Sequence, residues 1–154
     1  MRFKGLLMAL AIAPAMLAPL PAAAQVASSE AEQLRQLDIM LMVTALRCRT
    51  DAADFQDDYN RFSARHLATM NQAARELRAN YGTGQQAVRR LDRLSTTIAN
   101  RFGQGHPWLE CSQLRQVTRD LADSSGRQVL LAAADELLAE GAPRRDTLVA
   151  RYGE

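Results

Sequence analysis

Lysine is almost missing from this sequence, because Lys4 is the only one among 154 residues. Lys4 falls in a stretch with the pattern of a cleaved leader. We therefore expect the mature chain to have no side-chain amine for a Schiff base or for lysine-dependent phosphate binding. Nucleophile motifs, P-loops and Gly-x-Gly-x-x-Gly patterns are missing as well, so the sequence itself assembles no catalytic motif.

Cysteines and aromatic residues are also scarce. Only two cysteines are present, and neither Cys-x-x-Cys nor Cys-x-x-Cys-His occurs, which disfavours redox chemistry and covalently attached haem. No histidine and methionine are placed as a pair of haem ligands, and we expect no cofactor. With 5% aromatic residues, the core must consist mostly of Leu, Ala, Met and Val, which suits closely packed helices.

The first 24 residues have the pattern of a secretory signal peptide. Arg2 and Lys4 precede an apolar stretch that ends in Pro21 and three alanines, Ala22 to Ala24. Prolines interrupt this stretch, which disfavours a membrane anchor. We expect cleavage near Ala24, a single mature domain of residues 25–154, and a location in the periplasm or outside the cell.

Removal of the leader changes the charge balance. Two basic residues and no acidic one would be lost from 19 basic and 17 acidic residues, which leaves 17 of each. The mature chain is then formally neutral, so its net charge does not steer it to nucleic acid or to anionic lipid. In an exported chain, Cys48 and Cys111 are expected to form one intramolecular disulfide.

Apolar residues recur at helical spacing, and no useful stretch alternates apolar and polar residues as a strand would. Residues 37–48 are apolar on nearly every side of a helix, Met42 and Leu46 included, and only Asp38 and Arg47, near the two ends, are charged. Such a helix needs neighbours all round, so we expect it at the centre of the fold. A capping-box pattern, Ser29 with Glu32, marks its expected start.

Shorter amphipathic segments follow this helix. The second helix should be capped by Thr50 or Asp51, and Pro107 is well placed to open the fourth. The sequence therefore predicts an all-α fold, an antiparallel bundle of four to five helices with one disulfide. The expected segments are the cleanest apolar stripe from Phe55 to Tyr81, then residues 85–101, 107–121 and 129–138.

Four aspartates, Asp51, Asp54, Asp57 and Asp58, stand at the start of the second segment. Spacings of three and four would place several carboxylates on one helix face, as in a cation site. The run lacks the glycine turn and the terminal glutamate of a calcium loop, and Arg61 stands where it can pair with Asp57. We expect a solvated helix start and no metal.

His66 lies on the apolar stripe, and no carboxylate or second ligand stands at helical spacing from it. We expect a half-buried histidine that is satisfied by a neighbouring group.

Several arginines, Arg89, Arg90 and Arg93 with Arg144 and Arg145, are candidates for holding an anion. Their dispersal among equal numbers of acids favours ordinary surface charges.

The segment GQGHPWLEC, residues 103–111, is the most distinctive loop, because it combines His106 with the only tryptophan, Trp108. An exposed Trp and His between glycines would suit a recognition tip. Trp108 is also three residues before Cys111, so the alternative is that it packs over the disulfide and caps the bundle. The structural role is favoured, and both residues are kept as candidate binding residues.

Two resemblances bear on function. The stretch LRQLDIMLMVTALR resembles the opening helix of helical chorismate mutases, but that family depends on an active-site lysine that the mature chain does not have. The blocks DIMLMVTALRCR, DRLSTTIANRFGQGHPWLEC and QLRQVTRDLA resemble small exported proteins of Gram-negative bacteria that have no assigned function. This second resemblance covers most of the mature chain and implies location and fold, with no catalytic residue.

We expect an exported, non-catalytic helical-bundle protein that binds a protein or a small ligand in the periplasm. The alternative is a stress- or acid-activated periplasmic chaperone, because 17 acids in a neutral chain give a strong positive charge at low pH. An enzyme ranks third, since it requires a site around His66 or His106 that only the fold brings together.

Overall fold

The computed structural model describes residues 22–139, and the regular structure of this part of the chain is entirely helical. The helices are α1 (Ala22–Cys48), α2 (Gln56–Tyr81), α3 (Gly84–Phe102), α4 (Cys111–Asp123) and α5 (Arg127–Leu137). The predicted all-α bundle is confirmed. Most of the predicted signal peptide and the last 15 residues of the predicted domain, 140–154, lie outside the described residues.

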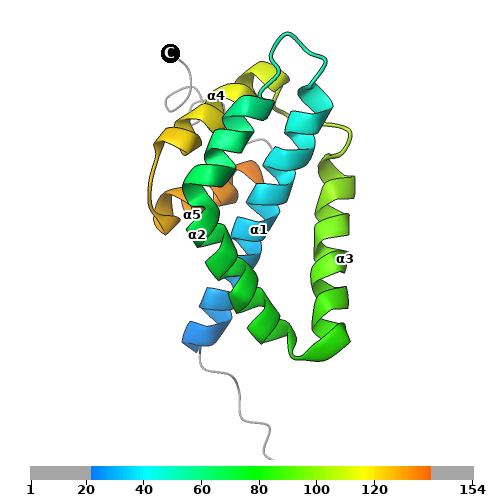
Figure 1. Ribbon diagram of the computed structural model, residues 1–154, viewed down its shortest axis with the longest axis vertical. Helices are drawn as coiled ribbons and strands as arrows, with labels where there is room; N and C mark the ends of the chain where they lie inside the picture. The colour runs from blue at the N-terminus through cyan, green and yellow to red at the C-terminus, as the bar shows by residue number, and fades with distance from the viewer. Residues whose placement is uncertain (1–21, 140–154) are drawn as a thin grey trace, which may run out of the picture.

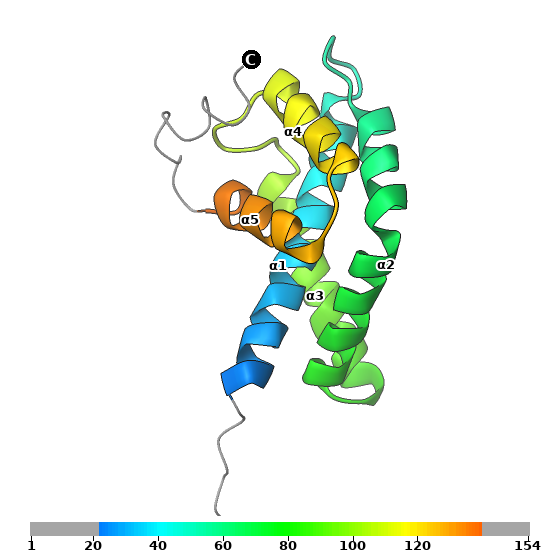
Figure 2. The same ribbon diagram turned by 90° about the vertical axis from the view of Figure 1, so that its left-hand side faces the viewer.

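The first helix is the centre of the fold, as its apolar sequence predicts. α1 contacts each of the other four helices. Figure 1 shows α1 running between α2 and α3, with α2 antiparallel to both, and Figure 2 shows α5 lying across α1. Leu34, Leu37 and Leu41 are fully buried on α1.

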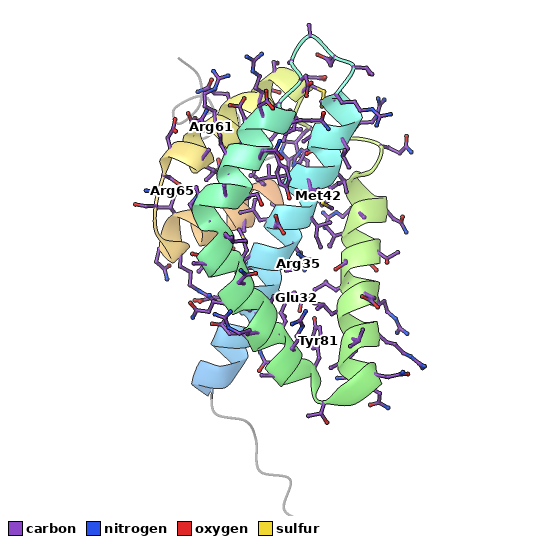
Figure 3. All side chains as sticks on the ribbon, viewed as in Figure 1. Glu32, Arg35, Met42, Arg61, Arg65 and Tyr81 are labelled. Carbon is purple, nitrogen blue, oxygen red and sulfur yellow. A yellow bond between two sulfur atoms is a disulfide. The ribbon has the colours of Figure 1, made fainter. Side chains whose placement is uncertain are left out.

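One side of α1 is less covered than expected. Met42 and Leu46 keep 38% and 48% of their surface exposed, so the prediction of neighbours all round is wrong for these two residues. Met42 lies on the face of α1 that looks out between α2 and α3 (Figure 3). These two helices flank that face of α1 and do not close over it.

Large side chains fill the space between the helices. Phe55 and Phe62 of the α2 region and Phe102 at the end of α3 are completely buried. The other largest fully buried side chains are Leu34, Leu37, Met40, Leu41, Leu77, Leu114, Leu130, Leu137 and Val117. Burial of one such side chain contributes about 1.5–3 kcal/mol, which is how a core with few aromatic residues holds the bundle together.

α2 and α3 form a helical hairpin with a very short turn. Gly82 has a φ of 96° and Gly84 a φ of 71°, which are left-handed values that glycine adopts without a Cβ clash. The turn therefore ends α2 where the sequence predicts. Figure 1 shows this turn at the end of the molecule opposite the connection from α1 to α2.

Three helix starts differ from the predictions. α1 begins at Ala22, before Ser29, because the alanine-rich residues between them are strong helix formers. α2 begins at Gln56, since the side chains of Asp51 and Asp54 accept hydrogen bonds from backbone N–H groups two residues on and hold a turn.

The start of α4 was also predicted incorrectly. Pro107 does not open it, because the helix begins at Cys111 with Glu110 as its N-cap. The Glu110 side chain accepts a hydrogen bond from the Gln113 backbone, and the Gln113 side chain accepts one from the Glu110 backbone at 2.9 Å. This reciprocal capping box satisfies two backbone N–H groups at the start of α4 that have no partner within the helix.

Candidate functional site

A pocket of about 360 Å³ lies at the end of the molecule where α1 stops and α4 begins. One wall comes from the end of α1 and the turn after it, with Arg47, Cys48, Thr50 and Asp51. The other wall is the 104–111 segment between α3 and α4. The structure thus brings the distinctive loop of the sequence to a hollow next to the C-terminal end of the central helix.

The predicted disulfide is present and forms part of this pocket. Cys48 is the last residue of α1 and Cys111 the first of α4, and their sulfur atoms are 2.04 Å apart. Cys48 is buried and Cys111 is half-buried. The covalent bond holds the two walls together, so the shape of the pocket depends on it.

His106 is fixed by hydrogen bonds on both sides of its ring. Its Nε2 lies 2.9 Å from the Leu137 carbonyl oxygen, and because a carbonyl can only accept, Nε2 carries the proton. Nδ1 then accepts a long 3.5 Å hydrogen bond from the Trp108 backbone N–H. The ring is therefore the neutral Nε2–H tautomer.

The surroundings of His106 keep it neutral. Burial lowers its pKa, and the positive charge of Arg101 acts in the same direction, while the hydrogen bond to Leu137 opposes both. The ring also stacks on Phe102, with centroids 5.6 Å apart. With both nitrogens engaged, His106 has the contacts of a structural residue and no free nitrogen for proton transfer.

Trp108 combines the two roles that the sequence left open. Its side chain is half-buried, packs against the hydrophobic core, and meets His106 edge-on with ring centroids 4.6 Å apart. It also lines the pocket together with the disulfide. Its indole Nε1 is buried and has no hydrogen-bond partner in the described part of the chain. Trp108 is thus both a cap on the bundle and part of the pocket wall.

Charged groups in the pocket differ in whether they are already engaged. Asp51 accepts a hydrogen bond from the Ala53 N–H at 2.8 Å, and the Glu110 carboxylate caps α4. Arg47 is exposed, and it forms neither a hydrogen bond nor an ion pair with any residue that the structure describes. Arg47 is therefore the charge in this pocket that is available to a ligand.

A second polar cluster lies between α2 and α4, and it corrects the prediction of a solvated acidic run, because one of the four aspartates of that run is buried. Asp58 is buried, with Arg61 at 3.3 Å, Arg119 at 3.4 Å and Arg115 at 3.7 Å from its carboxylate oxygens. Arg61 also pairs with Asp123 at 2.6 Å, so the expected pair with Asp57 is wrong. Figure 3 shows Arg61 extending from α2 toward α4.

This cluster joins α2 to α4 and has a structural role, not that of a binding site. Each arginine has solvent on one side, so its ion pair contributes little individually, whereas together they neutralise a buried acid. Asp51 and Asp54 stay in the exposed turn, as expected for a solvated acidic run. Between residues 22 and 139, no group of His, Cys, Asp and Glu is arranged to hold a metal ion.

His66 has the structural role that the sequence predicts. It is 3% exposed, and its Nε2–H donates to the Leu121 carbonyl oxygen at 2.8 Å. Leu121 is in the last turn of α4, and its carbonyl oxygen also accepts hydrogen bonds from the Ser124 backbone N–H at 3.2 Å and from the Ser124 hydroxyl at 2.8 Å. His66 and His106 therefore have the same structural role, since each donates a hydrogen bond to a carbonyl oxygen at the C-terminal end of another helix.

Asp38, the only acidic residue in the apolar part of α1, also has a shifted pKa. Burial raises the pKa of its carboxyl group, while Arg35 and the hydrogen bond from the Tyr59 hydroxyl at 3.1 Å oppose this rise. The same contact and burial raise the pKa of Tyr59. These residues fasten α1 to α2 and lie away from the pocket lining.

The comparisons with known proteins leave the site to be judged on its geometry. The chain matches no protein-family model, no curated protein and no solved structure. Among the described helices, none combines the length and the hydrophobicity that crossing a bilayer requires.

Proposed function

We propose that this protein is an exported, non-catalytic binding protein whose pocket beside the disulfide takes a carboxylate group. The observation that carries the proposal is the unpaired Arg47 in a pocket that also contains the indole of Trp108. A volume of about 360 Å³ is at the small end of the range for ligand pockets. The carboxylate belongs to a small ligand or to the end of a protein chain.

The chemistry of the lining favours a carboxylate. A guanidinium group forms two parallel hydrogen bonds with a carboxylate, and Arg47 has all of its donors free. The Trp108 ring offers an apolar surface beside it for the rest of the ligand. Asp51 is engaged in a turn and Glu110 in the cap of α4, and neither forms an ion pair with Arg47.

Binding is favoured over catalysis by the state of the two histidines. His106 lines the pocket, but both of its ring nitrogens have hydrogen-bond partners, and His66 is buried away from it. The disulfide supports an oxidising location such as the periplasm.

Because Trp108 is the only tryptophan, its fluorescence reports directly on this pocket. We would titrate the protein with benzoate and with short peptides that have either a free or an amidated C-terminus. We expect a saturable change that needs the free carboxylate. It should be lost in Arg47→Gln and kept in Arg49→Gln, a neighbouring exposed arginine outside the pocket.

The two probes separate the sources of the carboxylate. A response to the free peptides alone identifies a chain terminus, and a response to benzoate alone identifies a small ligand. No saturable change with any probe, or equal responses from the two arginine variants, would overturn the proposal.

Export is tested separately by the mass of the protein recovered from a periplasmic fraction. We expect a chain that starts at Gln25 with both cysteines oxidised. A chain that keeps Met1, or one recovered only from the cytoplasm, would contradict the exported location.

The second candidate is an acid-activated chaperone, and the lowered pKa of His106 favours it. Acid would charge a half-buried ring between Phe102 and Trp108 and, by protonating Nδ1, remove the hydrogen bond that this nitrogen accepts from the Trp108 N–H. We expect an acidified sample to bind a dye for exposed apolar surface and to suppress aggregation of a client protein. Failure to suppress aggregation at low pH would remove this candidate.

A further inference from the structure

Some arginines of this protein form ion pairs, and others, gathered on the α2–α3 hairpin, form none with a described residue. The ion pairs of the described residues use Arg35, Arg61, Arg115, Arg119 and Arg127. The α2–α3 hairpin carries another group at the end away from the pocket, and none of its members forms an ion pair with a described residue. We call this group the hairpin arginines: Arg75, Arg78, Arg89, Arg90 and Arg93, all of them exposed.

Within the hairpin itself, few acids compensate the charge of the hairpin arginines. Residues 75–93 contain these five arginines and two acids, Glu76 and Asp92, which gives a local net charge of +3. Glu76 is already engaged by Arg127 at 3.0 Å. The mature chain is formally neutral as a whole, but this end of it is basic. Net charge alone therefore does not exclude an anionic partner at this end.

Geometry spreads these charges over an accessible surface. Arg75 and Arg78 are three residues apart on α2, and Arg89 and Arg93 are four apart on α3, so each pair shares a helix face. The hairpin turn between them lies at one extremity of the molecule, opposite the pocket (Figure 1). Val88, which is 56% exposed, adds an apolar side chain beside Arg89.

We infer that the tip of the α2–α3 hairpin docks on a bilayer surface rich in anionic phospholipid. Guanidinium groups bind phosphate with two hydrogen bonds, and a bilayer presents phosphates across a surface wide enough to meet arginines on both helices. The exposed Val88, next to Arg89 in the sequence, suits the boundary between headgroups and acyl chains. No helix inserts, and contact is peripheral.

A nucleic acid fits this surface less well. Proteins that hold single strands combine arginines with aromatic side chains on which bases stack. The only aromatic residue between positions 75 and 93 is Tyr81, which is half-buried and whose hydroxyl donates to Glu32 at 3.5 Å. Figure 3 shows Tyr81 near Glu32 at this end of the bundle.

Docking by the hairpin would orient the protein. With the turn of α2 and α3 on the membrane, the pocket at the other end faces away from it and stays open to solution. The inference does not rest on the proposed ligand, because the two surfaces share no residue.

Co-sedimentation of the full chain with vesicles tests the inference. Vesicles of phosphatidylcholine alone are compared with an equimolar mixture of phosphatidylcholine and phosphatidylglycerol. We expect binding only to the mixture, and we expect it to fall steeply as salt rises from about 0.05 M to about 0.3 M. Arg89→Gln with Arg93→Gln should weaken binding about tenfold or more.

The matched control is Arg47→Gln with Arg49→Gln, which removes the same charge at the pocket end. This control should change vesicle binding less than about twofold, while losing the tryptophan response to carboxylates. Lysine at positions 89 and 93 should restore most of the binding. The two proposals therefore fail independently.

Three results would overturn the inference. They are equal losses from the two pairs of substitutions, the absence of binding to the anionic vesicles, and tighter binding to single-stranded DNA or polyglutamate than to vesicles of equal charge.

Discussion

The two ends of this molecule are built in different ways. At the pocket end, a disulfide joins α1 to α4, and the 104–111 loop is tied to α5 through His106. At the hairpin end, α2 and α3 turn back on each other through Gly82 and Gly84 and carry exposed arginines. Both ends contain buried side chains, with Leu77 and Ala87 at the hairpin end, but the covalent link is at the pocket end.

α3 shows the change within a single helix. Ile98 and Phe102, near the pocket end, are buried, whereas Leu91 is half-buried and Val88 is 56% exposed. The helix is amphipathic over its whole length, so its pattern alone does not reveal the difference. Amphipathicity predicts which face turns inward, and only the neighbouring helices decide how deeply each residue is covered.

The largest predicted effect comes from removing the covalent link. Replacing both cysteines with alanine should lower the free energy of unfolding by about 4 kcal/mol, because the 63-residue separation gives the unfolded chain a long loop to lose. Urea unfolding measures the change. The native protein should show the same loss when a reductant is added, and the variant should not respond to it. A loss below about 1 kcal/mol would mean that the pocket end is held by packing instead.

A matched pair of truncations in α3 compares the two ends directly. Ile98→Ala should cost about 3 kcal/mol, because it leaves a cavity at a site that is 5% exposed. Leu91→Ala removes a side chain of the same size at a half-buried site and should cost about 1 kcal/mol. Equal losses in thermal or urea unfolding would show that the hairpin end is packed as tightly as the pocket end.

The sequence predicted the elements better than their mutual contacts. The α2 stripe was predicted correctly, with Phe62, His66 and Leu77 buried, because a helical period is a local property. The cysteine pair was predicted because an exported chain with two cysteines has one intramolecular pairing. Ser29, Thr50 and the proline in the loop were misleading as start signals.

Contacts across long sequence separations carried no such signal. Asp58 meets Arg119 across 61 residues, and His106 meets the Leu137 carbonyl across 31. Neither follows from a spacing, because each requires two helices to be placed first. His106 and Trp108 could be selected as candidates from the sequence because these residue types are rare in it. Arg47 could not be selected, because only the fold shows that it lines the pocket.

The pH dependence of stability should differ in sign between two half-buried groups, His106 and Asp38. The pKa of His106 is lowered in the fold, so its contribution to stability is present above the ordinary value of 6.5 and is lost as the pH falls below it. His106→Gln should remove this loss in urea titrations between about pH 7 and pH 5. An unchanged slope in the variant would place the acid sensitivity elsewhere.

Asp38 should act in the opposite direction. Its pKa is raised in the fold, so its contribution to stability is present below the ordinary value of 3.8 and is lost as the pH rises through the raised value. Asp38→Asn should remove that loss. A variant that loses stability as the pH rises just as the native protein does would show that the Asp38 carboxyl group is not the cause.

The smallest effect on stability is predicted at the hairpin arginines. Glutamine at positions 75, 78, 89, 90 and 93 should change the free energy of unfolding by less than about 0.5 kcal/mol, because these side chains are exposed and form no ion pair. The same measurement on Asp58→Asn should give a clear loss, since three arginines would then face a neutral group. A large loss at the hairpin would show that its arginines are structural.

The position of the disulfide also gives the chain a covalent topology. Cys48 and Cys111 enclose α2 and α3 in a closed ring, from which α1 leaves on one side and α4 and α5 on the other. A protease that cuts once at the Gly82–Gly84 turn opens this ring without releasing either fragment. The nicked protein would migrate as one species until reduced and then separate into two, so a cut at this exposed turn leaves the two fragments joined.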